Sequence, residues 1–106
     1  MEDDVNKLEA LLDEAISILR GHGVSHWADW LIKDVNLIRN DDFYGVEHLL
    51  TAFGGMGSLN DLGLAEPSKD DPTVLVTSTD DARFQAVLSS IYSLAKDLTR
   101  SRSSQR

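Results

Sequence analysis

The sequence contains no cysteine among its 106 residues. This absence excludes disulfide bonds, thiolate metal ligands and cysteine nucleophiles, and it suits the reducing cytoplasm. The chain also has no apolar run near the roughly 20 residues that a membrane-spanning helix needs. Its first residues, Met1-Glu2-Asp3-Asp4, are acidic where a secretory signal peptide is positively charged. We therefore expect a cytoplasmic protein with no membrane contact.

Proline is scarce, and both prolines fall within residues 65–73 together with three acids. Such a composition is typical of an exposed loop, because proline and aspartate favour turns over helices and central strands. We predict that this segment is a surface loop and the most mobile part of the chain.

Basic residues are also few, with 10 Lys and Arg against 18 Asp and Glu, so the formal net charge is -8. Three of the bases lie beyond residue 99, which leaves residues 1–99 with 18 acids, seven bases and a net charge of -11. Such a body repels nucleic acids and anionic lipids, and it speeds the encounter with a basic protein. The simpler alternative is that the charge only maintains solubility.

Four stretches have the apolar spacing of amphipathic helices. The first covers about residues 3–20, where Gly21 can stop it in the left-handed conformation. The second follows Ser25 as N-cap, residues 40–42 end it and cap the third, and the fourth covers about residues 80–99. The predicted apolar positions are Val5, Leu8, Leu12, Ala15, Ile16, Leu19, Trp27, Ala28, Leu31, Val35, Ile38, Phe43, Val46, Leu49, Leu50, Phe53, Phe84, Val87, Leu88, Ile91, Leu94, Ala95 and Leu98.

Three residues of the second and third helices carry specific expectations. Asp34 falls off the apolar stripe, so we expect it to face solvent. Trp30 lies beside the stripe and is either a second core residue or a partly exposed anchor for a partner. Gly45 weakens a helix by roughly 1 kcal/mol relative to alanine, which makes sense where another segment crosses closely.

Because each apolar stripe must pack against another, the sequence predicts an all-α fold, a compact bundle of about four helices. One long irregular connection, residues 54–78, joins the third helix to the fourth. Residues 73–77 are candidates for a short extended pair with residues 59–64, although the latter fit a helical turn equally well. We predict a single helical domain over residues 1–99 and a flexible Ser/Arg tail over residues 100–106.

A glycine-rich stretch after the third helix is the most distinctive local feature. Three glycines within four residues permit positive φ, and the flanking apolar residues indicate a turn anchored to the core. We interpret it as a helix stop in which the Asn60 and Asp61 side chains bond local amides. The residues of this structural motif are Phe53, Gly54, Gly55, Met56, Gly57, Ser58, Asn60 and Asp61.

The segment Phe43-Tyr44-Gly45-Val46-Glu47-His48-Leu49-Leu50, with residues 52–62 after it, resembles a family of small uncharacterised bacterial proteins that share an FGGMGSLND-type motif. The helix with both tryptophans and the last helix are similar in spacing, so the likeness spans most of residues 5–98. In size and acidity these proteins resemble the immunity proteins of bacterial toxin systems. The resemblance supplies no catalytic residues.

Other chemistries have weaker support in the sequence. Amides of residues 54–58 could form an anion nest, but the stretch lacks the P-loop lysine, and Asp61 has the wrong sign. His22 and His26 are four residues apart, yet the glycines around His22 disfavour a continuous helix that would align them on a metal. Ser58 lacks a nucleophile elbow and a base at a motif spacing. We expect no enzyme activity, no metal and no cofactor.

The leading hypothesis is a non-enzymatic acidic binding protein, an immunity protein that neutralises a basic toxin or nuclease domain by occlusion. The alternatives are a small-molecule- or metal-binding protein that uses the glycine-rich loop, residues 54–61, and a structural homodimer. The predicted partner-binding residues combine two aromatic side chains with four acids. They are Trp30, Tyr44, Asp41, Asp42, Asp70 and Asp71.

Overall fold

The computed structural model describes residues 2–54 and 57–104. Within these ranges the chain forms four α-helices, which are α1 (Glu2–Gly21), α2 (Ser25–Arg39), α3 (Tyr44–Leu50) and α4 (Asp81–Ser104). A single 3-10 turn, η1 (Leu59–Asp61), and two short strands, β1 (Ala65–Pro67) and β2 (Leu75–Thr77), lie in the connection between α3 and α4. The predicted all-α bundle with a short extended pair is confirmed.

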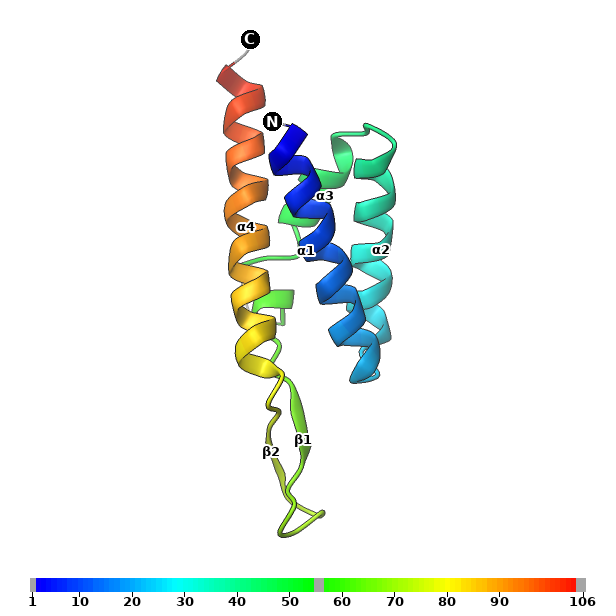
Figure 1. Cartoon of the computed structure of the whole chain (residues 1–106), viewed down its shortest axis with the longest axis vertical. Coiled ribbons are helices and arrows are strands. Elements are labelled where there is room, and N and C mark those ends of the chain that lie inside the picture. The colour runs from blue at the N-terminus through cyan, green and yellow to red at the C-terminus, as the bar shows by residue number, and fades with distance from the viewer. Residues whose placement is uncertain (1, 55–56, 105–106) are drawn as a thin grey trace.

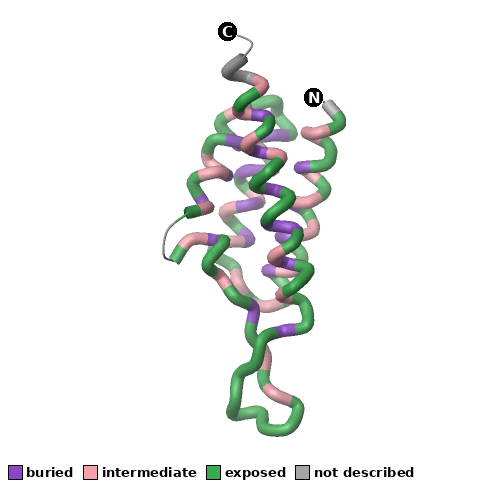
Figure 2. Tube along the Cα trace, turned by 90° about the vertical axis from the view of Figure 1, so that its left-hand side faces the viewer, coloured by how far each residue is buried: buried purple, intermediate pink, exposed green. Residues whose placement is uncertain are grey.

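The helices form an elongated bundle (Figure 1). α1 and α2 run antiparallel, α4 lies beside α1, and the short α3 packs against both α2 and α4. Two strands extend from one end of this bundle as a projecting hairpin, and the principal axes of the molecule measure 57 × 23 × 21 Å. The buried residues lie along the helices of the bundle, whereas the hairpin is exposed along most of its length (Figure 2).

The core confirms most of the predicted apolar positions. Phe84, Leu8, Leu12, Leu31 and Leu49 are all fully buried. The connection between α3 and α4 contributes Leu59 and Leu64 to the same core cluster. Trp27 and Trp30 are only partly buried and pack against its edge.

Both interhelical links in the first half differ in detail from the prediction. α1 includes Gly21, and the residue with left-handed backbone conformation is Gly23, which follows the helix and has φ +72°. The amides of Gly23 and Val24 bond the carbonyls of Arg20 and Leu19, which is the Schellman arrangement. Ser25 is the first residue of α2 and not its cap, because Val24 precedes the helix and no side chain caps it.

The extended pair has a different partner from the predicted one. β2 pairs antiparallel with β1, with Ala65 opposite Thr77 and Pro67 opposite Leu75. The expected partner, residues 59–64, instead contains η1 and turns its leucines into the core. The predicted surface loop over residues 65–73 therefore starts with a strand, and the turn of the hairpin occupies the rest.

α4 continues beyond its predicted end. We expected residues 100–106 to be a flexible tail, but the helix extends to Ser104. Gln105 and Arg106 lie outside the described residues. A bond from Thr99 Oγ1 to the carbonyl of Ala95 and an ion pair of Arg100 with Asp97 connect successive turns near this end.

In the described part of the chain, no helix combines the length and apolar character that crossing a membrane requires.

Candidate functional site

Five ring side chains from α2 and α3 gather on one surface, which we call the aromatic patch: His26, Trp27, Trp30, Tyr44 and His48. The Trp30 and His48 rings are stacked, with centroids 4.3 Å apart and planes at 18°. Tyr44 approaches His48 at 5.7 Å, and Trp27 approaches Trp30 at 5.2 Å. Tyr44 remains 51% exposed, so the patch presents aromatic surface to solvent.

A buried carboxyl group holds this patch in position. Asp34 was predicted to face solvent, but it is fully buried, and this expectation was wrong. Its Oδ1 shares a hydrogen bond of 2.5 Å with His48 Nδ1. Trp30 and Asp34 are one turn apart on α2, so the stacking and the hydrogen bond act on His48 from the same helix.

Burial raises the pKa of Asp34 to about 6, while the hydrogen bond to His48, the charge of His48 and the charge of Lys33 oppose this rise. The second carboxylate oxygen, Oδ2, is buried and has no hydrogen-bond partner among the described residues. Ionisation of Asp34 is therefore unfavourable in the folded protein, and His48 is the group that compensates for it.

Gly45 explains how α3 comes close enough for this contact. A Cβ atom at this position would lie 2.8 Å from the Asp34 carbonyl oxygen and 2.9 Å from side-chain carbons of Ile38 and Leu37. The prediction of a close crossing at Gly45 is confirmed, and the crossing element is α2. Only glycine lets the two backbones meet there, so Gly45 brings His48 to Asp34.

Four exposed acids belong to the same stretch of chain as the aromatic patch. Asp29, Asp41, Asp42 and Glu47 are exposed, and none of them forms an ion pair within the described ranges. These acids therefore leave uncompensated negative charge on the part of the chain that carries the rings.

Three acids of α1 differ, because two arginines from neighbouring helices bind them. Arg39 bonds Glu9 and Asp13, while Arg83 binds both carboxylate oxygens of Glu14. The hydrogen bonds from Arg83 hold the pKa of Glu14 below its ordinary value. These pairs bring α2 and α4 to α1 and neutralise part of that surface.

Asp41 and Asp42 also have local structural roles. Asp41 has φ +58° and occupies the left-handed position after α2. The amides of Asp41 and Asp42 bond the carbonyls of Ile38 and Leu37, which again is the Schellman arrangement. Asp42 Oδ1 then accepts a hydrogen bond of 3.0 Å from the Tyr44 amide at the start of α3. The predicted end of α2 at residues 40–42 is confirmed, whereas Phe43 and not residues 40–42 occupies the N-cap position of α3.

The structure separates the predicted partner-binding residues into two groups. Trp30, Tyr44, Asp41 and Asp42 lie around α2 and α3, whereas residues 70 and 71 lie in the hairpin turn, at the far end of the molecule (Figure 1). Asp71 accepts hydrogen bonds from the amide and hydroxyl groups of Thr73, which lower its pKa. The two groups do not form one compact site.

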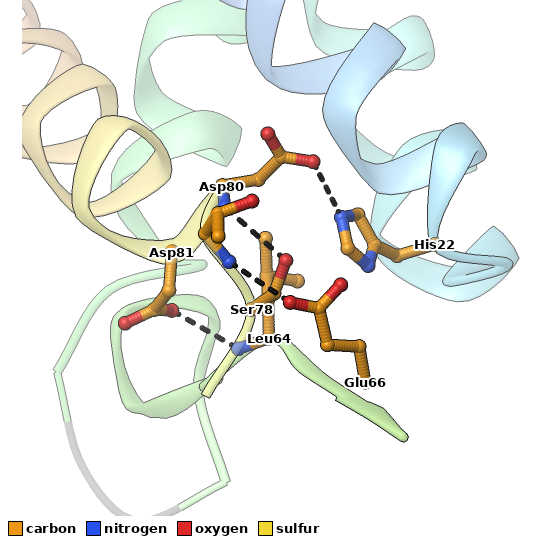
Figure 3. Close-up of polar contacts among 7 residues, drawn as sticks. His22, Leu64, Glu66, Ser78, Asp80 and Asp81 are labelled. Atoms are coloured by element: carbon orange, nitrogen blue, oxygen red, sulfur yellow. Dashed lines mark hydrogen bonds and ion pairs between the residues drawn. The ribbon is translucent and has the colours of Figure 1, made fainter. Parts of the chain in front are cut away.

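Polar contacts attach the base of the hairpin to the bundle (Figure 3). The Leu64 amide donates to Asp81 Oδ1 at 3.0 Å, and the Thr79 amide donates to Glu66. His22 Nε2 lies 2.9 Å from Asp80 Oδ2, a contact that links the end of α1 to the start of α4. The first two contacts fix the base of the hairpin, where both of its strands join the bundle.

The glycine-rich stretch is stabilised by its own side chains, as predicted. Gly54 and Gly57 have φ +92° and +80°. Their amides donate to Asn60 Oδ1 and Asp61 Oδ2 at 3.0 and 3.1 Å. Gly55 and Met56 of the predicted motif lie outside the described residues. Since side chains already bind these two amides, they do not point freely toward an anion.

A groove of about 510 Å³ borders the same stretch between α3 and α4. Phe53 and Tyr92 line it with ring centroids 5.3 Å apart, and Lys96 adds a positive charge. The other lining residues are Leu50, Gly54, Asn60, Gln85, Leu88 and Ser89.

The three histidines have different polar partners or none, although His26 and His48 both belong to the aromatic patch. His22 contacts Asp80, His26 belongs to the aromatic patch, and His48 bonds Asp34. Among the described residues, no group of three or more His, Asp or Glu side chains is placed to hold a metal ion.

Sequence reasoning missed Asp34 and His48 as members of the site. The available signal was spacing, because His26, Trp30 and Asp34 recur every four residues and therefore share one face of α2. The charge of Asp34 placed it off the predicted apolar stripe, and the position of Trp30 was left open between the core and an exposed anchor. The contact with His48 depends on how α3 crosses α2, which the sequence pattern does not specify.

A family model described as a domain of unknown function (DUF6966) matches residues 20–73, which is slightly more than half of the chain and contains the whole aromatic patch. No curated protein and no solved structure matches the chain.

Proposed function

We propose that this chain, which belongs to the DUF6966 family of domains of unknown function, is a non-enzymatic protein that binds a basic protein partner through the aromatic patch. The observation that carries the proposal is the stack of Trp30 on His48 beside the half-exposed Tyr44. Aromatic side chains held on helices lose little conformational entropy on binding, and they are enriched at interface hot spots.

The charge around the patch supports a basic partner. Four exposed acids without ion pairs in the described residues lie within the same α2–α3 stretch of chain as the rings, and the chain as a whole carries a net charge of -8. An apolar centre with a charged rim is the usual organisation of a specific interface. The acids accelerate the encounter with a positively charged protein, and the rings supply the desolvated contact.

In its specific form, the proposal is that the partner is a toxin or nuclease domain with a basic, nucleic-acid-binding surface. The protein would then act as an immunity protein that covers this surface and excludes the nucleic acid. Similarity to immunity proteins in size and acidity motivates this form. Occlusion requires no catalytic group in the protein itself.

The experiment measures binding to a purified basic toxin or nuclease domain encoded beside the gene. Tyr44→Ala should weaken binding by about tenfold or more, as expected for an aromatic hot spot. Tyr92→Ala is the matched control, because Tyr92 is similarly exposed, at 42%, but lies on α4. It should leave the affinity unchanged.

Two charge variants identify the end of the molecule that contacts the partner. Asn replaces both Asp41 and Asp42 in one variant, and both Asp70 and Asp71 in the other. Asparagine retains the cap and tolerates the left-handed conformation, so the fold is preserved. We expect the first variant to slow association several-fold at low salt and the second to have less effect. Equal effects, or no binding to any neighbouring toxin domain, would contradict the proposal.

A second candidate function uses the groove beside the glycine-rich stretch. Its aromatic walls and Lys96 suit a small anionic molecule with an apolar body. Thermal-shift screening against aromatic carboxylates and nucleotides tests it, because a ligand that binds only the folded state raises the melting temperature. If such a ligand raises the melting temperature of the wild type but not that of Lys96→Met, the result would favour this function over protein binding.

A further inference from the structure

The hairpin is bound to the bundle only at its base, and its apolar residues face solvent. Leu75 is 70% exposed, Val74 49% and Val76 42%. Three adjacent apolar residues at this exposure contribute almost nothing to the core. A two-stranded ribbon alone is marginally stable, so a third strand would stabilise it.

The register of the hairpin determines which backbone groups point outward. The Ser68 amide donates to the Val74 carbonyl, and the Ser78 amide donates to the Leu64 carbonyl. Residue pairs therefore alternate, so that 64–78, 66–76 and 68–74 are bonded pairs while 65–77 and 67–75 are not. In an antiparallel ribbon, the amide and carbonyl groups of residues in non-bonded pairs, here 65–77 and 67–75, point away from the partner strand.

The two outer edges consequently differ. On β1 the outward residues are Ala65 and Pro67, and proline has no amide hydrogen to donate. On β2 the outward residues are Leu75 and Thr77, which both keep their amide and carbonyl groups. β2 thus offers two donors and two acceptors in the spacing of a strand, and its flanking side chains are exposed.

We propose that the outer edge of β2 binds an extended, basic segment of a partner protein as a third strand of the hairpin. This is a second interaction surface, separate from the aromatic patch. Main-chain hydrogen bonds to Leu75 and Thr77 would supply affinity, and the exposed apolar side chains would supply contact area. The polar anchors in Figure 3 fix the ends of the hairpin, which reduces the entropy lost when a strand is added.

The negative charge of the hairpin favours a basic segment as the third strand. Residues 64–81 contain five acids and one base. The acids are Glu66, Asp70, Asp71, Asp80 and Asp81, and the base is Lys69. A second copy of this chain would bring the same negative charge to the edge, whereas a segment rich in Lys or Arg complements it.

The test uses a displayed library of nine-residue peptides in which Lys or Arg alternates with Val, Ile or Tyr. Enriched peptides are measured against the wild type, Thr77→Pro and Ala65→Pro. Thr77→Pro removes an outward donor from β2, and Ala65→Pro removes the corresponding donor from β1, so neither removes a bond within the hairpin. We expect about tenfold weaker binding for Thr77→Pro and unchanged binding for Ala65→Pro.

Hydrogen exchange of the wild type provides a second readout that needs no variant. The Leu75 and Thr77 amides should exchange fast in the free protein and at least about tenfold more slowly with peptide bound. The Val76 amide, which points toward β1, should change little. No enriched peptide, equal binding by both proline variants, or unchanged exchange at Leu75 and Thr77 would each overturn the proposal.

Sedimentation of the free protein tests the competing occupant. If the wild type dimerises and Thr77→Pro is monomeric, the outer edge of β2 binds a second copy of the chain. The proposal of a basic partner segment would then be wrong. Loss of toxin binding in Tyr44→Ala bears only on the aromatic patch, so the two proposals fail independently.

Discussion

At the scale of single residues, Asp34 has the most unusual environment in the protein. Its carboxyl group is fully buried, and one oxygen bonds His48 while the other has no partner among the described residues. A buried carboxylate without full compensation disfavours its charged form. The folded state therefore favours protonation of Asp34 more than the unfolded state does, and its stability depends on pH.

We predict that Asp34→Asn becomes more stable relative to the wild type as pH rises from 4 to 7. The pKa of Asp34 rises from its ordinary 3.8 to about 6 on folding, so its favourable contribution is present below pH 3.8 and is lost as pH passes 6. The difference in unfolding free energy should change by at most about 3 kcal/mol. Urea unfolding at several pH values measures it.

Asp29→Asn is the matched control on the same helix. Asp29 is exposed, so water solvates its carboxylate in the folded and the unfolded state. Its difference from the wild type should vary much less with pH. A pH-independent difference for Asp34→Asn would show that His48 fully compensates the buried charge.

At the scale of secondary-structure elements, the crossing of α2 and α3 positions the aromatic patch. α3 has only seven residues, so packing and not intrinsic helix propensity must hold it in place. Its contact with α2 passes through Gly45, where the approach leaves no room for a side chain.

We predict that Gly45→Ala destabilises the protein by about 2 kcal/mol or more, although alanine is the better helix former. The added Cβ would meet the Asp34 carbonyl, a backbone atom that cannot rotate away. Gly21→Ala is the control, because Gly21 ends α1 with no atom within 4 Å of the added Cβ. It should be neutral or slightly stabilising in denaturant unfolding. Equal effects of the two substitutions would contradict the close approach.

At the scale of the whole molecule, the hairpin accounts for the elongated shape. The radius of gyration of the Cα atoms is 15.1 Å, whereas a globular chain of this length has about 13 Å. The hairpin has its own register and its own exposed residues, and the core cluster includes none of the residues from 65 to 77.

We predict that replacing residues 65–77 with Asn-Gly leaves the bundle folded. Leu64 and Ser78 are already a hydrogen-bonded pair, which a two-residue turn can close. The unfolding free energy should change by less than about 1 kcal/mol, and the longest dimension in small-angle X-ray scattering should fall by about 15–20 Å.

Leu59→Ala serves as the contrasting variant in the same connection. Leu59 is fully buried, so its truncation should cost about 2–5 kcal/mol. A hairpin deletion as damaging as this substitution would mean that the hairpin supports the core.

The four helices, the glycine-rich turn and the excess of negative charge were predictable from the sequence alone. These features depend on local periodicity, on the conformational freedom of glycine and on composition, which a chain carries before it folds. The bonds of Asn60 and Asp61 to nearby amides were predictable for the same reason, because donor and acceptor are at most six residues apart. Nearby groups meet without knowledge of the tertiary fold.

The burial of Asp34, the partner of β2 and the separation of the predicted binding residues into two groups depend on the tertiary fold. Asp34 and His48 are 14 residues apart, and they meet because α3 crosses α2 at Gly45. β2 pairs with residues 65–67 because residues 59–64 are held in the core. Long-range packing competes with local preference at these positions, and the burial of apolar surface outweighs it.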